Sequence, residues 1–186
     1  MAGKPWERTE RKLARNHSWK SSPGYQIFVA NGGELRFDIP VGWVIVADST
    51  SFKFHDQQPP DDECVIELTI NRLPPADYSE FPLEAALSDV LGGGYDGPVT
   101  RGTIAYEKRG LTRLAWGDVR YVDQSVDREA IGWTLIGLRG QIQVLVTMAY
   151  WVDDVPQFEP AWKELVRSIK LGEQVDMLGN PTRVLH

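Results

Sequence analysis

The chain has 186 residues, of which 42% are apolar and 25% are charged, a balance typical of one globular domain. Its formal net charge of −6 argues against binding to nucleic acid, because contacts with phosphates require a basic surplus. Cys64 is the only cysteine, so neither an intramolecular disulfide nor a cysteine-based zinc site can form.

Residues 1–24 are poor in aliphatic side chains, rich in lysine and arginine, and end in Ser-Ser-Pro-Gly. Such a composition does not bury enough apolar surface to order itself. The sequence therefore predicts a flexible basic N-terminal arm that adds little to the core. Trp6 and Trp19 are its only aromatic side chains apart from His17, and they are the part of the arm best suited to dock on a partner.

The location of the protein is predicted from two features. The positive charges of the arm are not followed by an apolar segment, so it does not read as a secretory signal. The longest mainly apolar stretch, residues 142–152, is too short for a membrane span, which needs about 20 residues. We therefore expect a cytoplasmic protein, unless a leader has been removed, and no membrane span.

From residue 25 the apolar side chains recur at every second position, which is typical of strands. Two such runs, at 25–29 and 35–39, are separated by Asn-Gly-Gly and predict a hairpin. Pro40 and Gly42 then predict a turn before a strand that begins at Trp43. Residues 52–54 continue the strand pattern, and a polar loop with two prolines follows at 57–62.

The second half of the chain predicts a meander between two helices. Residues 64–70 alternate like a half-buried strand, and apolar side chains at helical spacing over 83–91 predict a helix that stops at three glycines. Short connections then force antiparallel pairing of the four strands that follow. These strands are predicted at 104–108, 112–122, 131–138 and 141–151.

The strand at 141–151 is apolar on both faces and must be covered twice. Apolar residues at helical spacing over 162–169 supply the second helix, with Pro160 expected in its first turn. The predicted fold is α+β, an antiparallel sheet meander with one helix on each face, or α/β/α sandwich. Residues 25–171 form this single domain, and residues 172–186 are predicted to be a C-terminal tail.

Side chains suited to catalysis do not converge. His17, His55 and His186 have no paired spacing for a metal or a proton relay. The serines lack the Gly-x-Ser-x-Gly context of a nucleophile elbow. We therefore expect that the protein is not an enzyme and uses no cofactor.

One acidic group offers oxygen ligands for a cation. It consists of Asp56, Asp61, Asp62 and Glu63. The group lacks the alternating spacing and the fixed glycine of an EF-hand loop. The sequence therefore does not predict a metal site. If the protein did bind a cation, these four residues would be the weak candidates for its ligands.

The tryptophan content is the unusual feature of this chain. Trp116, Trp133 and Trp151 fall on three successive predicted strands. If their indoles share one face, they form either a core layer beneath a helix or the wall of an apolar groove. We name them as candidate ligand-binding or partner-binding residues, and both alternatives fit the sequence.

Two phrases in the sequence carry a resemblance to a known superfamily. Phe-Asp-Ile-Pro-Val-Gly-Trp at 37–43 and Trp-Lys-Glu-Leu-Val-Arg-Ser-Ile at 162–169 occur in the order of the PsbP-like α/β/α sandwich superfamily. The chain resembles this superfamily over about residues 35–171. In the first phrase Phe37 and Ile39 are expected to face the core, and Trp43 to plug the start of the next strand.

The resemblance also implies a function. The superfamily includes the extrinsic PsbP protein of photosystem II and Ran-binding nuclear-import factors, and it is known chiefly for docking onto other proteins. It implies a non-enzymatic protein-interaction or assembly module whose partner is another protein. The alternative is a small protein that binds an apolar ligand in a pocket between sheet and helix. The sequence leaves the oligomeric state open.

Overall fold

The computed structural model describes residues 19–48, 51–93, 98–175 and 181–184. Two α-helices, α1 (Leu83–Gly92) and α2 (Val155–Ser168), and a 3-10 turn, η1 (Val152–Asp154), accompany the strands in this part of the chain. The strands are β1 (Tyr25–Ala30), β2 (Leu35–Pro40), β3 (Val44–Ala47), β4 (Ser51–His55), β5 (Val65–Arg72), β6 (Val99–Arg101), β7 (Ala105–Arg109), β8 (Thr112–Asp123), β9 (Arg128–Arg139), β10 (Ile142–Trp151), β11 (Lys170–Leu171), β12 (Glu173–Val175) and β13 (Pro181–Val184).

A large sheet forms the centre of the molecule. Its strands follow the order β3-β4-β5-β10-β9-β8-β6, with β7 pairing to β8 as well, and all pairs are antiparallel. The strands β7 to β10 form the predicted meander. Tight turns between alternating apolar runs fix this arrangement locally, because two strands joined by a short turn must lie side by side.

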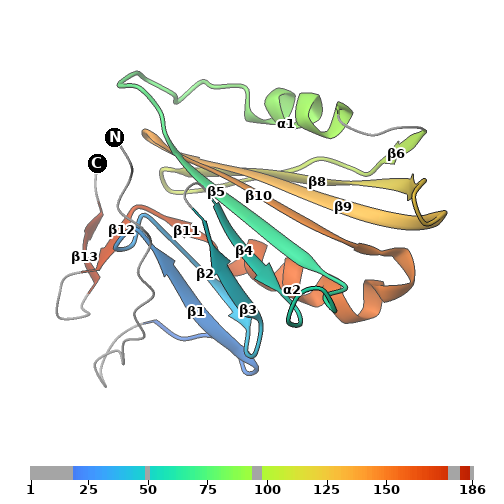
Figure 1. The fold of residues 1–186 in the computed structure, drawn as a ribbon. Helices are drawn as coiled ribbons and strands as arrows, with labels where there is room; N and C mark the ends of the chain where they lie inside the picture. The colour runs from blue at the N-terminus through green and yellow to red at the C-terminus, as the bar shows by residue number, and fades with distance from the viewer. Residues whose placement is uncertain (1–18, 49–50, 94–97, 176–180, 185–186) are drawn as a thin grey trace.

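The two faces of the large sheet are covered differently, as Figure 1 shows. The helix α1 lies on one face and buries three leucines, Leu83, Leu87 and Leu91, against β8 and β9. The other face carries α2 together with a small sheet of order β1-β2-β11. The predicted α+β fold with one helix on each face is thereby confirmed.

The first hairpin, β1 and β2, is not part of the large sheet and belongs to this second, smaller one. Pro40 ends β2, and Gly42 adopts φ +93°, a left-handed conformation that glycine tolerates without steric cost. The chain turns there, so that β3 joins the edge of the large sheet while β1 and β2 stay beside α2 (Figure 1). This corner between two sheets and a helix is where the candidate site lies.

The core between α2 and the sheets is aromatic. Phe37 and Ile39 are completely buried, as predicted. Phe28 contacts Phe37 and Phe54 with ring centroids 5.3 and 4.8 Å apart, in tilted and edge-to-face geometry. Aromatic pairs in such geometry add to the stability gained from burial alone.

The described end of the predicted arm is packed onto the domain. Trp19 is only 5% exposed and lies beneath the guanidinium of Arg36, 4.3 Å from the ring centroid. The backbone N–H of Val41 donates to the carbonyl of Gly24. Trp19 thus packs on the folded domain through a buried indole and a cation–π contact. Residues 1–18, including Trp6, lie outside the described residues.

The predicted C-terminal tail also contains structure. The strands β12 and β13 pair with each other, and the carboxylate of Glu173 forms an ion pair with Arg36 at 2.8 Å. Within the described residues, neither helix has the length and apolar content that a membrane crossing requires.

The start of α2 differs from the prediction. Pro160 lies inside the helix, in its second turn, and not in the first turn. The turn η1 leads directly from β10 into α2, so the helix begins earlier and Pro156 occupies its first turn. A proline is tolerated there because the first N–H groups of a helix have no partner within it.

Candidate functional site

The three tryptophans that the sequence singles out do not share one surface. Trp133 and Trp116 lie on the face of the large sheet that α2 covers, and both pack against its core. Trp151 comes one residue after the buried Tyr150, which lies on that face, and therefore points to the opposite face. A single wall made of all three indoles is excluded by this alternation.

Trp133 is part of a core layer beneath α2. Its ring stacks on that of Trp162 with centroids 5.4 Å apart, and its Nε1–H donates to the hydroxyl of Tyr150 at 2.9 Å. Burial raises the pKa of Tyr150 to about 12. On the opposite face, the Trp151 Nε1–H donates to Glu63 at 3.1 Å.

The acidic group is largely engaged in internal contacts. Oδ1 of Asp56 accepts the backbone N–H groups of Glu63 and Cys64, each at 2.9 Å, and thereby closes the loop between β4 and β5. Asp62 contacts Nδ1 of His55 at 2.9 Å. Asp61 is exposed. No group of three or more potential metal ligands gathers anywhere in the described part of the chain.

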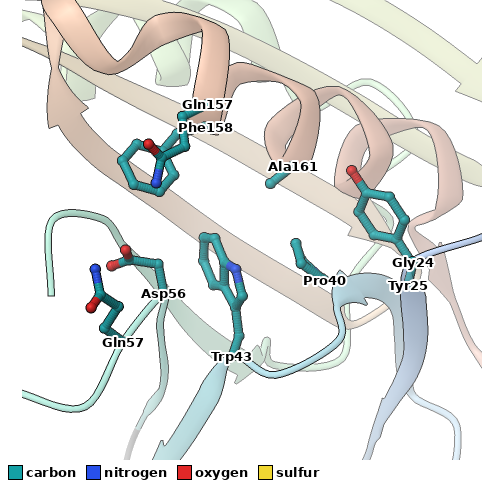
Figure 2. A pocket seen from close by; sticks show the side chains of 9 residues that line it. All are labelled: Gly24, Tyr25, Pro40, Trp43, Asp56, Gln57, Gln157, Phe158 and Ala161. Carbon is teal, nitrogen blue, oxygen red and sulfur yellow. The ribbon is translucent and has the colours of Figure 1, made fainter.

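A cavity of about 330 Å³ lies at the corner where β1, β2 and β3 meet α2 (Figure 2). Four segments that are far apart in the sequence form it. We call it the Trp43 groove, and it is lined by Gly24, Tyr25, Pro40, Trp43, Asp56, Gln57, Gln157, Phe158 and Ala161.

Trp43 lies at the centre of this groove. It follows the turn at Gly42 and precedes β3, and its ring meets that of Phe158 edge to face, with centroids 6.5 Å apart. The side chain is only half-buried: it packs against the core but also lines the cavity. Trp43 is therefore less buried than the sequence predicts, because part of its ring lines the cavity instead of the core.

The groove is apolar in its middle and polar toward its ends. Figure 2 shows Trp43 between Asp56 and Gln57 on one side and Tyr25 on the other, with Phe158 contributed by α2. The loop that supplies Asp56 and Gln57 is strongly acidic, since no lysine or arginine occurs between positions 53 and 72. This end of the groove is therefore formed by a loop whose charged side chains are all carboxylates.

Behind the Tyr25 end, Arg167 joins two carboxyl groups, Asp38 of β2 and Glu164 of α2. Burial raises the pKa of Asp38, whereas the hydrogen bonds of Arg167 lower the pKa of Glu164. Nε of Arg167 donates to Glu164 at 2.8 Å, and its guanidinium lies 3.6 Å from Asp38. These contacts fix β2 against α2 and so hold the two walls of the groove together.

Sequence reasoning missed this groove as a site. The sequence predicts only a structural role for Trp43, and nothing in a linear sequence brings Gln57 and Gln157 together. One signal was available: an aromatic side chain directly after a glycine turn lies at the end of a strand, where a core is open to solvent.

Comparison with known proteins gives both a family and a fold. The profile of the Alr1449 family matches residues 26–175. Uncharacterized protein alr1449 of Nostoc sp. (strain PCC 7120) is 37% identical over 168 residues, which cover 90% of this chain and 88% of the relative.

Two solved structures show the same fold. The cyanobacterial PsbP protein CyanoP of Synechocystis sp. PCC 6803 matches with a TM-score of 0.56 at 11% identity, over 81% of this chain and 94% of that one. The Saccharomyces cerevisiae Ran-binding protein Mog1p matches with a TM-score of 0.51 at 13% identity, over 81% and 96% of the two chains. The resemblance to the PsbP-like superfamily is thereby confirmed at the level of the fold.

Proposed function

The chain belongs to the Alr1449 family, and we propose that it is a non-enzymatic interaction module that binds another protein through the Trp43 groove. The observation that carries this proposal is the half-buried indole of Trp43 in a cavity of about 330 Å³. Tryptophan and tyrosine are the residues most often found at the energetic centre of protein interfaces.

The composition of the groove favours a protein partner over a small apolar ligand. The groove lies between sheet and helix, as the alternative hypothesis requires. However, pockets for apolar ligands are lined mainly by hydrophobic side chains with few polar groups. Here Asp56, Gln57 and Gln157 make up a third of the lining. An aromatic centre with a polar rim is the pattern of a protein interface.

The groove lining also supports a non-enzymatic role. It contains one carboxylate and no histidine, serine or cysteine, so nucleophile and base are not paired there. Cys64 is 1% exposed, and burial raises the pKa of its thiol. A neutral, inaccessible thiol is a poor nucleophile. The name of Mog1p as a Ran-binding protein is consistent with a binding role for this fold.

The proposal is tested by site-specific photocrosslinking in extract of the source cells. A benzophenone amino acid at Gln157, on the rim of the groove, should form an adduct with a partner protein. The same probe at Val126 is the control, because this residue is 58% exposed in the turn between β8 and β9. The captured protein is then identified, purified and titrated against the variants by calorimetry.

Trp43→Ala should weaken binding of the purified partner at least about tenfold, as expected for the central aromatic of an interface. Tyr106→Ala is the matched control, since Tyr106 is an aromatic residue, 43% exposed, on β7 at the other edge of the large sheet. The proposal is wrong if the partner binds Trp43→Ala as tightly as the unchanged protein, or if it crosslinks equally from both probes.

A further inference from the structure

The Trp43 groove has an accessible carboxylate next to an aromatic surface. Oδ1 of Asp56 accepts two backbone N–H groups from its own loop, which fixes the orientation of the carboxylate. Within the described residues, no hydrogen bond or ion pair engages the second oxygen, Oδ2. The Asp56 carboxylate is therefore held in place through Oδ1, and a ligand can bind to Oδ2 without breaking these hydrogen bonds.

The surroundings of this carboxylate favour a cation. The loop between β4 and β5, residues 56–64, contains four acidic residues and no lysine or arginine. Its negative potential attracts a positively charged partner and repels an acidic one. The side-chain amides of Gln57 and Gln157 line the same end of the groove and add two oxygen acceptors.

The middle of the groove suits the rest of a long cationic side chain. Trp43 and Phe158 offer apolar surface between the polar ends (Figure 2). A guanidinium group is planar, stacks on indole and presents a fork of N–H donors to a carboxylate. A lysine has the same charge, but it lacks the planar fork.

We infer that the occupant of the Trp43 groove is an arginine side chain of a basic segment of the partner. Its guanidinium pairs with Asp56 and with the oxygens of Gln57 and Gln157, and its methylene groups lie along Trp43. This inference rests on the proposed function, because it names the chemistry by which the same groove recognises its partner.

The inference is tested with short peptides instead of the natural partner. The full chain is labelled with ¹⁵N, and the indole N–H signal of Trp43 is assigned from its loss in Trp43→Phe. The probe is acetyl-Gly-Arg-Gly-amide, titrated to about 10 mM, the range in which an isolated side chain binds. The lysine peptide and the citrulline peptide, which keeps the shape of arginine without its charge, are the comparisons.

A saturable shift of the Trp43 signal is expected with the arginine peptide, with binding at least about tenfold weaker for citrulline and intermediate for lysine. Asp56→Asn should weaken the arginine peptide by about tenfold, since asparagine keeps the acceptor for the two loop N–H groups and loses only the charge. Asp61→Asn is the matched control: it removes the same charge from an exposed position in the same loop.

Three results would overturn the inference: no saturable shift, equal binding of arginine and citrulline, or equal effects of the two asparagine variants. The last result would show attraction by the overall charge of the loop only. Failure here is distinguishable from failure of the proposed function. A partner that crosslinks at Gln157 and depends on Trp43 supports the groove as a protein-binding site even when the arginine peptide does not bind.

Discussion

Replacing Trp43 by alanine should lower the free energy of unfolding by about 2 kcal/mol, less than the same change costs at Trp162. Complete burial of a tryptophan makes its removal cost about 3 to 5 kcal/mol. Trp162 is 1% exposed and stacks on Trp133, so Trp162→Ala belongs in this range.

The smaller value for Trp43 follows from the part of its ring that stays in contact with water. Removing this side chain loses the burial of the covered part and one edge-to-face contact with Phe158, which is worth about 0.5 to 1.5 kcal/mol. A cavity that already exists is enlarged, so the neighbouring core side chains lose few other contacts. The domain should therefore stay folded in Trp43→Ala, which makes this variant usable in binding experiments.

The measurement is urea unfolding followed by far-ultraviolet circular dichroism, because tryptophan fluorescence would change with the mutation itself. With a slope of about 2 kcal/mol per molar urea, Trp43→Ala should shift the midpoint by about 1 M and Trp162→Ala by about 2 M. Equal shifts for the two variants would refute the reasoning, since they would show that Trp43 is a core residue and that the groove is closed in solution.

Three further predictions concern the core and the groove wall. Gly137→Ala should destabilise the domain by about 1 to 3 kcal/mol in the same urea assay, because the new Cβ would lie 2.7 Å from a methyl group of Val144. Cys64 should not react with a thiol reagent such as dithionitrobenzoate in the folded protein and should react fully once urea unfolds it, because it is 1% exposed and burial raises its thiol pKa. The lowered pKa of Glu164 means that its pairing with Arg167 stabilises the fold above the pKa of the unfolded chain and is lost as the pH falls through the folded pKa. Glu164→Gln should therefore destabilise the protein at pH 7, and thermal melts of the two proteins should converge as the pH falls below the lowered pKa of Glu164.

The sequence predicts the fold well wherever the determining interactions are local. The meander of β7 to β10 follows from alternation and short turns, each of which is visible within a few residues. The strand β11 escaped prediction because it is two residues long and depends on pairing with β2, far away in the chain. Trp19 escaped for the same reason: its burial depends on Arg36 and not on neighbours in the sequence.

The candidate site was less accessible to prediction. The sequence alone is enough to place Trp151 and Trp133 on different faces. The buried positions of β10 alternate and end at Tyr150, so the next residue, Trp151, faces the opposite side of the sheet. The Trp43 groove could not have been found in this way. A periodic pattern shows which side chains face the core. It does not show where two elements that cover the same sheet, here the β1-β2 hairpin and α2, leave a gap between them.

The groove follows from how the two sheets and α2 meet. The hairpin of β1 and β2 leaves the large sheet at Gly42, and α2 packs against β2 and β10. On α2, the groove meets Ala161, whose side chain is too short to fill the space beside Phe158. The small side chain therefore leaves an indole open at a corner where Arg167 of α2 pairs with Asp38 of β2. A pocket whose walls are held together before binding loses little conformational entropy when a ligand binds.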